Sequence, residues 1–270
     1  MNWVIDDRPD VLHYEMTDVL DKAILGDCLQ VMGKLPAESV DLVFVDPPYY
    51  LQLPKRKLVR WSGTVVEGVS ESWDQFDSFE AYDSFTKSWL TEVQRLMKPQ
   101  ATLWVIGTYH NIFRVGTLLQ DLGFWILNNV VWLKNNPVPN FRHVRFTNAT
   151  ETLIWAVKDK TAKQYTINFD QVKAFGVGKV GANVWEVPVC SGRQRIKGED
   201  GKKLHPTQKP VRLLERVILT SSNDGDVVFD PMAGVGTTGD VARQHGRHYI
   251  MIEREPKYVA AIEQRLSHGA

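Results

Sequence analysis

Residues Val40–Tyr49 read Val-Asp-Leu-Val-Phe-Val-Asp-Pro-Pro-Tyr, an apolar run followed by an acid, two prolines and an aromatic residue. The apolar part predicts a buried strand over Val40–Val45. Pro47 and Pro48 end this strand abruptly, because neither proline can donate a hydrogen bond to a neighbouring strand. The residues after it are therefore expected to form a rigid loop at the carboxyl end of a strand, where open α/β sheets bind their ligands.

This loop, Asp46–Tyr49, offers a carboxylate, backbone carbonyls and an aromatic face. Together these groups form an acceptor-rich clamp that suits a planar group bearing an NH2. The simpler interpretation is a strand-ending turn, since consecutive prolines often mark turns. Motifs elsewhere in the chain separate the two interpretations.

A glycine-rich segment lies far downstream. Val227–Phe229 reads as another buried strand, and residues 230–239 continue it as Asp-Pro-Met-Ala-Gly-Val-Gly-Thr-Thr-Gly. The three glycines match the GxGxxG pattern of dinucleotide-binding sites, and Glu253 follows the next predicted strand. A nicotinamide-dependent dehydrogenase is therefore a competing interpretation. Against it, the glycines come near the C-terminal end of the sequence, whereas a dinucleotide requires a second mononucleotide-binding half.

Three further segments place polar residues next to predicted strands or prolines. Ala23–Cys28 is a short apolar strand that ends in Gly-Asp-Cys, and residues 205–210 read His-Pro-Thr-Gln-Lys-Pro. Within the latter, Thr207 and Lys209 carry a hydroxyl and an ammonium that can bind a carboxylate. Residues 132–141 read Trp-Leu-Lys-Asn-Asn-Pro-Val-Pro-Asn-Phe. Each segment taken alone is also consistent with an ordinary turn or loop.

These motifs and their order resemble the β group of DNA amino-methyltransferases. The resemblance runs from about Lys22 to Leu266 and is closest to the cell-cycle-regulated adenine methyltransferases and their restriction-system relatives. It implies a Rossmann-like fold that uses S-adenosylmethionine (AdoMet), with permuted motif order because the catalytic loop precedes the cofactor loop. Asp in the first position of the catalytic loop resembles the adenine-N6 branch, whereas the cytosine-N4 branch more often has Ser there.

The resemblance also assigns roles to individual residues. It makes Asp46, Pro47, Pro48 and Tyr49 the catalytic loop. It places in the AdoMet site Asp27, Cys28, Thr207, Lys209, Asp230, Pro231, Met232, Gly234, Gly236, Thr237 and Glu253. Met232 stands where the family usually has Phe, which keeps an apolar contact but removes an aromatic ring. The near relatives modify adenine in GANTC, but Tyr50 replaces an Asn of the family, so the recognised sequence does not follow.

Predicted strands alternate with predicted helices, which indicates an α/β fold with a mostly parallel sheet covered by helices on both faces. Apolar patterns predict strands at Lys22–Gly26, Val40–Val45, Thr102–Ile106, Ile126–Leu133, Glu151–Ala156, Val227–Phe229 and Tyr249–Ile252. Helical patterns fit Phe79–Met97, Ile112–Leu122, Val211–Ser221, Asp240–Gln244 and Tyr258–Arg265. We expect one catalytic domain over residues 1–270, with a DNA-contacting loop at 50–72 and a target-recognition region at 136–204.

The chain carries no net charge, with 32 basic and 32 acidic residues, so an electrostatic footprint for DNA phosphates has to be local. Basic residues gather in three stretches that follow the catalytic loop or precede residue 205. The predicted DNA contacts are Lys55, Arg56, Lys57, Arg60, Trp73, Arg142, Arg145, Arg193 and Arg195. A solvated face is the simpler interpretation of each stretch taken alone.

Composition argues against several classes of protein. Cys28 and Cys190 are too few for a disulfide framework or a cysteine-based metal site, and they suit a reducing cytoplasm. No apolar run approaches the ~20 residues that a membrane span needs. The N-terminal residues are acidic, which argues against a secretory signal. We therefore expect a cytoplasmic protein that is not secreted. The resemblance implies a bacterial, nucleoid-associated enzyme, and its expected reaction requires no metal.

The expected reaction is methyl transfer from AdoMet to N6 of an adenine in double-stranded DNA. The Asp46 carboxylate and the Pro47 carbonyl would accept the two N–H bonds of a flipped-out base, and Tyr49 would stack on it. Cytosine-N4 methylation needs the same acceptors and is the alternative within the family. A non-catalytic DNA-binding module that has kept the fold is a third hypothesis.

The resemblance also suggests partners other than DNA. Related enzymes commonly work as dimers, and Trp89, Phe113 and Trp125 lie on segments near the catalytic loop. We therefore expect a two-fold homodimer, the commonest form of symmetric assembly. The restriction-system relatives make a cognate restriction endonuclease a further candidate partner.

Overall fold

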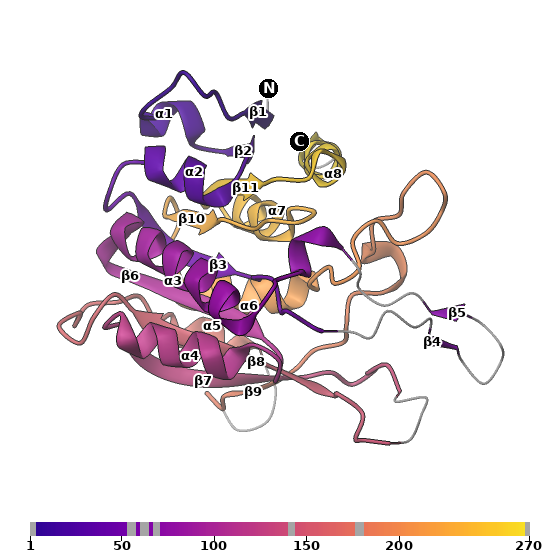
Figure 1. The fold of residues 1–270 in the computed structure, drawn as a ribbon. Helices are drawn as coiled ribbons and strands as arrows, with labels where there is room; N and C mark the ends of the chain where they lie inside the picture. The colour runs from indigo at the N-terminus through magenta and orange to yellow at the C-terminus, as the bar shows by residue number, and fades with distance from the viewer. Residues whose placement is uncertain are drawn as a thin grey trace.

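A single nine-stranded sheet organises the chain in a computed structural model, which describes residues 4–52, 58–59, 65–66, 71–139, 144–175 and 181–267 (Figure 1). The strands follow one another across the sheet as β1 (Val4–Asp6), β2 (Lys22–Leu25), β11 (His248–Glu253), β10 (Val227–Asp230), β3 (Val40–Val45), β6 (Met97–Gly107), β8 (Thr150–Val157), β7 (Trp125–Leu133) and β9 (Val184–Glu186). All neighbours are parallel except where β8 lies antiparallel between β6 and β7.

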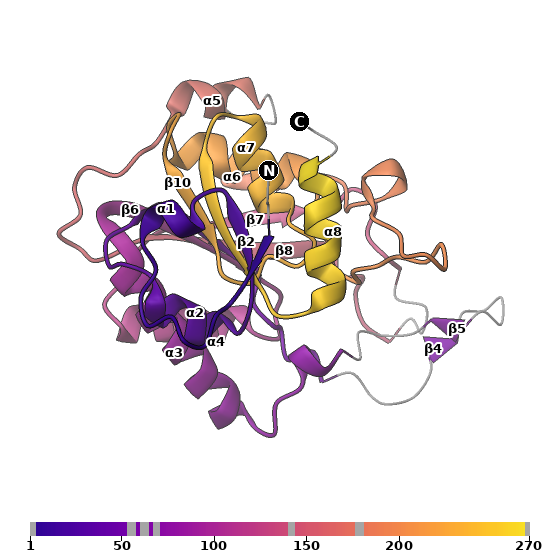
Figure 2. The same cartoon turned by 90° about the horizontal axis from the view of Figure 1, so that it is seen from above.

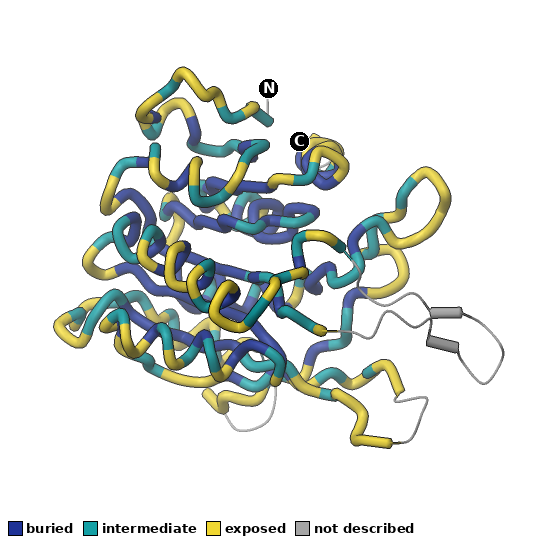
Figure 3. Tube along the Cα trace, viewed as in Figure 1, coloured by how far each residue is buried: buried dark blue, intermediate teal, exposed yellow. Residues whose placement is uncertain are grey.

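Helices cover both faces of the sheet (Figure 2). One face carries α2 (Cys28–Lys34), α3 (Phe79–Leu96) and α4 (Ile112–Asp121), and the other carries α6 (Val211–Ser221), α7 (Thr237–Gln244) and α8 (Pro256–Ser267). Strand β3 serves both layers, because Val43 and Val45 pack in the first core and Leu42 and Phe44 in the second. Figure 3 shows the resulting buried strands between half-exposed helices. Parallel strands covered on both faces are apolar throughout, which explains the unbroken run in Val40–Val45.

The predicted α/β methyltransferase architecture is confirmed. Every predicted strand and helix is present, and the largest shift is in β6, which begins at Met97 rather than Thr102. The permuted order is also visible in the topology, since β3 precedes β10 by most of the chain yet pairs with it directly. The catalytic and glycine-rich loops therefore leave neighbouring strands at the same edge of the sheet.

The sequence patterns did not predict several short elements. These are β1, β9, α2, α1 (Met16–Val19), α5 (Phe169–Ala174), the two-stranded pair β4 (Leu58–Val59) and β5 (Val65–Val66), and the 3-10 turns η1 (Ser72–Asp74) and η2 (Gly192–Gln194). Elements of three to seven residues are too short to show a full apolar period. The pair β4–β5 falls inside the expected DNA-contacting loop 50–72.

The three aromatic residues proposed for a dimer interface differ in exposure. Trp89 is a residue of α3 and its side chain is fully buried, so it belongs to the core and is not available to a partner. Phe113 on α4 is 74% exposed, and Trp125 at the start of β7 is 55% exposed. Within the described residues, no helix is long and apolar enough to cross a bilayer.

Candidate active site

A cavity of about 340 Å³ opens along the carboxyl edge of the parallel strands. The motifs at 23–28, 46–49, 205–210 and 230–239 all contribute to its walls, because β2, β3, β10 and β11 end there side by side, whereas residues 132–139 of the fifth segment do not. Of the predicted catalytic and cofactor residues, those that line it are Asp27, Cys28, Asp46, Pro47, Pro48, Tyr49, Thr207, Lys209, Asp230, Pro231, Met232, Gly234, Thr237 and Glu253. Gly236 is the exception. Gly236 is the N-cap residue directly before α7. It has a φ of 73°, and a Cβ there would lie 2.8 Å from Ile262.

The predicted DNA contacts are more scattered. Trp73 lines the cavity, whereas Arg145 and Arg193 are exposed and do not line it. Arg195 donates from Nε and Nη2 to the carbonyl of Cys190, at 3.1 and 2.6 Å, so its guanidinium supports a loop. Lys55, Arg56, Lys57, Arg60 and Arg142 lie outside the described residues.

The catalytic loop is held by a carboxylate from a distant segment. Asp74 in η1 accepts hydrogen bonds from the backbone N–H groups of Tyr49 and Tyr50, both at 2.7 Å, and of Leu51 at 2.9 Å. Successive N–H groups that converge on one anion form a rigid concave turn. Tyr50 adopts a φ of 51°, which a residue other than Gly adopts only at some cost in strain. Asp74 thus fixes the loop directly after the two prolines.

A second contact engages the carbonyl of Pro48 and not that of Pro47. The Tyr82 hydroxyl donates to the carbonyl of Pro48 at 2.9 Å, and the Asn111 amide donates to the Tyr82 hydroxyl at 3.2 Å. This engages the second proline carbonyl from the α3 side. The carbonyl of Pro47 is the one that we consider below as an acceptor for substrate.

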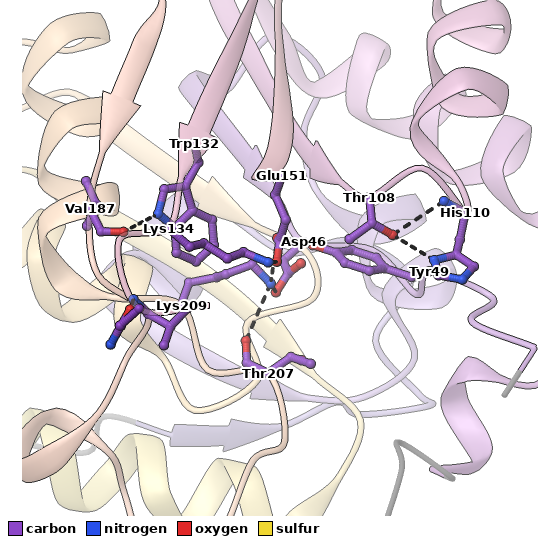
Figure 4. Close-up of polar contacts among 12 residues, drawn as sticks. Asp46, Tyr49, Thr108, His110, Trp132, Lys134, Glu151, Val187, Thr207 and Lys209 are labelled. Carbon is purple, nitrogen blue, oxygen red and sulfur yellow. Dashed lines mark hydrogen bonds and ion pairs between the residues drawn. The ribbon is translucent and has the colours of Figure 1, made fainter. Parts of the chain in front are cut away.

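At the head of the loop, Asp46 forms an ion pair with Lys209. Its Oδ2 lies 2.6 Å from Nζ of Lys209, and Figure 4 shows both side chains pointing into the same space beside Tyr49. Burial raises the pKa of Asp46, and the Lys209 ammonium opposes this shift. Burial works against the charge of Lys209, but the carboxylates of Asp46 and Glu151 outweigh it and raise the pKa of Lys209. The cation is thereby kept charged next to Asp46.

Two further acids line the cavity. Asp230 accepts from the backbone N–H of Met232 at 3.0 Å and from the Thr238 hydroxyl at 2.6 Å. Glu253 accepts from the backbone N–H of Gly234 at 2.8 Å, so the end of β11 is tied to the glycine-rich loop. Burial raises the pKa of each acid to about 7.

Three aromatic rings, those of Trp73, His205 and Tyr258, form one wall of the cavity. His205 lies parallel to Trp73, with ring centroids 6.0 Å apart, and edge-on to Tyr258 at 4.7 Å. Its Nδ1 accepts from the backbone N–H of Thr207 at 3.2 Å. Burial lowers the pKa of His205 to about 3, so the ring is neutral. A Cβ on Gly234 would lie 3.3 Å from this ring, which explains why the loop requires glycine there.

The sequence analysis missed Asp74, Tyr82 and Asn111 as supports of the catalytic loop. Asp74 lies beside Trp73, for which only a DNA contact was predicted. Tyr82 and Asn111 come from α3 and the start of α4, and nothing in their local sequence indicates a partner more than 25 residues away. Their roles depend on tertiary contacts.

Comparison with known proteins identifies the class of enzyme. The profile of the DNA methylase family of N6 and N4 methyltransferases matches residues 40–264, and the chain belongs to this family. It is 48% identical over 251 residues to the Type II methyltransferase M.HinfI of Haemophilus influenzae, covering 93% of this chain and 69% of that protein. It is 38% identical over 252 residues to the Type II methyltransferase M2.LlaDCHI of Lactococcus lactis subsp. cremoris, covering 93% and 91%.

Solved structures agree with this assignment. The fold matches the cytosine-N4-specific PvuII DNA methyltransferase with a TM-score of 0.68 at 23% identity, over 90% of this chain and 85% of that one. It matches M1.HpyAVI in complex with S-adenosylmethionine with a TM-score of 0.65 at 25% identity, over 90% and 98%. The protein is thus a restriction-modification type DNA methyltransferase, and its cofactor is AdoMet.

The cavity suits AdoMet in size and chemistry. Its volume lies at the small end of the range typical of small-molecule sites. The buried Glu253 carboxylate suits ribose hydroxyls, which are donors, and the loop through Gly234 brings backbone close to a ligand. The acidic side chains of Asp46, Asp230 and Glu253, which line the cavity, also favour a sulfonium cation. The residues present therefore fit the cofactor.

The shifted pKa of Glu253 predicts a pH-dependent stability. The pKa of Glu253 is about 7 in the folded protein and 4.5 ordinarily, so the folded state binds its proton more tightly than the unfolded state. The resulting contribution to the free energy of unfolding is fully present below pH 4.5 and is lost as pH rises through 7. Glu253→Gln stays neutral at every pH. Its free energy of unfolding relative to wild type should therefore rise between pH 4.5 and 7.5, by up to about 3 kcal/mol.

Urea unfolding of cofactor-free wild type and Glu253→Gln across this pH range measures the difference. The charge of Glu253 also raises the pKa of Asp230, so the two proteins are compared again in an Asp230→Asn background, where that contribution is absent. A difference between the two proteins that does not vary with pH would contradict the assignment.

Proposed function

We propose that the protein methylates the N6 amine of an adenine that is flipped out of double-stranded DNA. The observation that carries the proposal is that one cavity is lined both by Asp46 and Pro47, which offer a carboxylate and a carbonyl as an acceptor pair, and by Glu253. When bound, AdoMet supplies an electrophilic methyl group and a thioether leaving group. The remaining chemistry consists of holding a weak nucleophile in line with that methyl group.

The hydrogen-bond acceptors are needed because the N6 amine of adenine is a weak nucleophile. The N6 lone pair of adenine is delocalised into the ring, and it becomes available only when the nitrogen turns tetrahedral. Acceptors on both N–H bonds favour that geometry. Lys209 engages Oδ2 of Asp46 at 2.6 Å, so we assign Oδ1 of Asp46 and the carbonyl of Pro47 to the two N–H bonds. Such fixed acceptors contribute several kcal/mol to rate acceleration, because they need no reorganisation.

The same acceptors suit the end of the reaction. The methylated ammonium is a strong acid, and Asp46 is the nearest base that we assign to it. The raised pKa of the buried Asp46 makes its carboxylate a better proton acceptor than an exposed one. Tyr49 is 7% exposed and lines the cavity, and we assign its ring to stacking on the flipped base.

Two segments of the chain are candidates for contact with DNA. We propose that loop 50–72 and region 136–204 contact the duplex, since exposed Arg145 and Arg193 lie in the second of these stretches. Arg145 donates to the Tyr109 hydroxyl at 3.0 Å, which places a cation and an exposed aromatic ring together on a neighbouring surface. A cognate restriction endonuclease is the partner that we propose from the similarity to Type II methyltransferases.

Analysis of the methylated nucleoside tests the target base. Wild-type protein, tritiated AdoMet and unmethylated phage DNA should give labelled N6-methyladenine, because Asp46 begins the catalytic loop as in the adenine-N6 branch. Digestion of the DNA and chromatography of its nucleosides separate the products. Labelled N4-methylcytosine would establish the alternative instead, which the similarity of fold to the PvuII enzyme favours.

We also propose that the enzyme is a two-fold homodimer. Phe113 and Trp125 are exposed, as an interface requires, although Trp89 is not. Sedimentation at micromolar concentration should give the dimer mass for wild type, and Phe113→Ser/Trp125→Ser should shift it toward monomer. Wild type that sediments as a monomer and still methylates DNA would refute the proposal.

A further inference from the structure

The ion pair between Asp46 and Lys209 belongs to a longer row of charges. Nζ of Lys209 also lies 3.9 Å from Oε2 of Glu151, and Oε1 of Glu151 lies 2.8 Å from Nζ of Lys134. The side chains of Glu151 and Lys134 are only 10% and 11% exposed. Negative and positive groups therefore alternate along Asp46, Lys209, Glu151 and Lys134, as Figure 4 shows.

Glu151 also touches the catalytic loop directly. The hydroxyl of Tyr49 donates to Oε2 of Glu151 at 3.0 Å. Nζ of Lys209 lies 5.2 Å from the centroid of the same tyrosine ring. One carboxylate thus fixes both the aromatic ring that ends the catalytic loop and the cation that pairs with Asp46.

Glu151 and Lys134 stand at the base of the recognition region. Glu151 is the second residue of β8 and pairs with Trp132, whereas Lys134 directly follows β7. The N–H of Lys134 donates to the carbonyl of Ala149 at 2.8 Å. The ion pair between Glu151 and Lys134 therefore joins the start of β8 to the residue that follows β7.

Stability of the fold does not explain this arrangement. Buried ion pairs are often no more stabilising than apolar side chains of similar volume, because desolvation offsets the attraction between the charges. Removal of one partner is nevertheless costly, since it leaves a buried charge uncompensated. The three charged side chains linked to the catalytic carboxylate, Lys209, Glu151 and Lys134, therefore point to a role in the reaction.

We propose that Glu151 is a positioning residue for methyl transfer, which holds Tyr49 and Lys209 against Asp46, and that Lys134 holds Glu151 in turn. The inference rests on the proposed function, because it concerns the same site. It adds two residues to which the sequence analysis gave no role.

Glu151→Gln tests the proposal, since it removes the charge but keeps the shape and an acceptor for Tyr49. With tritiated AdoMet and unmethylated phage DNA, kcat should fall by roughly 100-fold, as expected for misplaced reacting groups. The rise in melting temperature on adding AdoMet should stay as in wild type. The carboxylates of Asp46, Glu151 and Asp230 all raise the pKa of Lys209. Loss of the Glu151 charge should therefore move the alkaline limb of the pH–rate profile to lower pH.

Asp41→Asn provides the matched control. Asp41 lies near the start of β3, at the opposite end from Asp46, and it pairs with Lys98 at 2.8 Å with 18% of its side chain exposed. This variant should lose stability but keep the kcat and pH profile of wild type. A Glu151→Gln enzyme with kcat within threefold of wild type and an unchanged pH profile would overturn the proposal.

A double-mutant cycle in urea supplies a readout that needs no activity. Lys134→Met and Glu151→Gln should each destabilise the protein, and the double variant should lose less than the two losses together. Additive losses would contradict a coupled pair. The wild-type rate alone tests the proposed function, whereas the ratio of variant to wild type, on whichever base is methylated, tests this inference.

Discussion

The burial of one carboxylate opposite one ammonium is the constraint on which the active site depends. Asp46 ends a strand that is covered on both faces, and its negative charge is tolerated there because Nζ of Lys209 lies 2.6 Å away. The ammonium comes from the loop before α6, so the pair joins two segments separated by 163 residues. Two prolines after Asp46 and the Asp74 carboxylate then fix the backbone that follows. The backbone of residues 46–51 is therefore fixed by contacts within the protein itself.

The parallel sheet places the second half of the chemistry beside the first. Because β3 pairs with β10, and β10 with β11, the loops that carry Asp46, Asp230 and Glu253 leave the sheet as neighbours. The antiparallel β8 lets Glu151 reach the same edge from the start of a strand rather than its end. The loops that carry Asp46, Asp230 and Glu253 thus line one cavity, and Glu151 reaches Tyr49 and Lys209 from the neighbouring strand. A permuted chain order changes none of this, since only the spatial order of strands matters.

Local sequence predicted those parts of the site that follow strands. Asp46, Asp230 and Glu253 each come directly after or at the end of an apolar run, which fixes both their place in the sheet and their direction. Asp74, Glu151 and Lys134 have no such signal, because their partners lie 17 or more residues away and are set by tertiary packing. Trp89 illustrates the same limit. A tryptophan on an amphipathic helix is equally compatible with an interface and a core, and only the packing of α3 shows that it is buried.

The central claim is that Asp46 serves the transfer step and not the binding of AdoMet. Its most direct test compares the two activities in Asp46→Asn, which keeps the shape of the side chain but removes its charge. Calorimetric titration should give an AdoMet Kd within about threefold of wild type, while methyl transfer to DNA falls by about 1,000-fold, the scale of losing a main electrostatic contact at the reacting group. Transfer within tenfold of wild type would contradict the account.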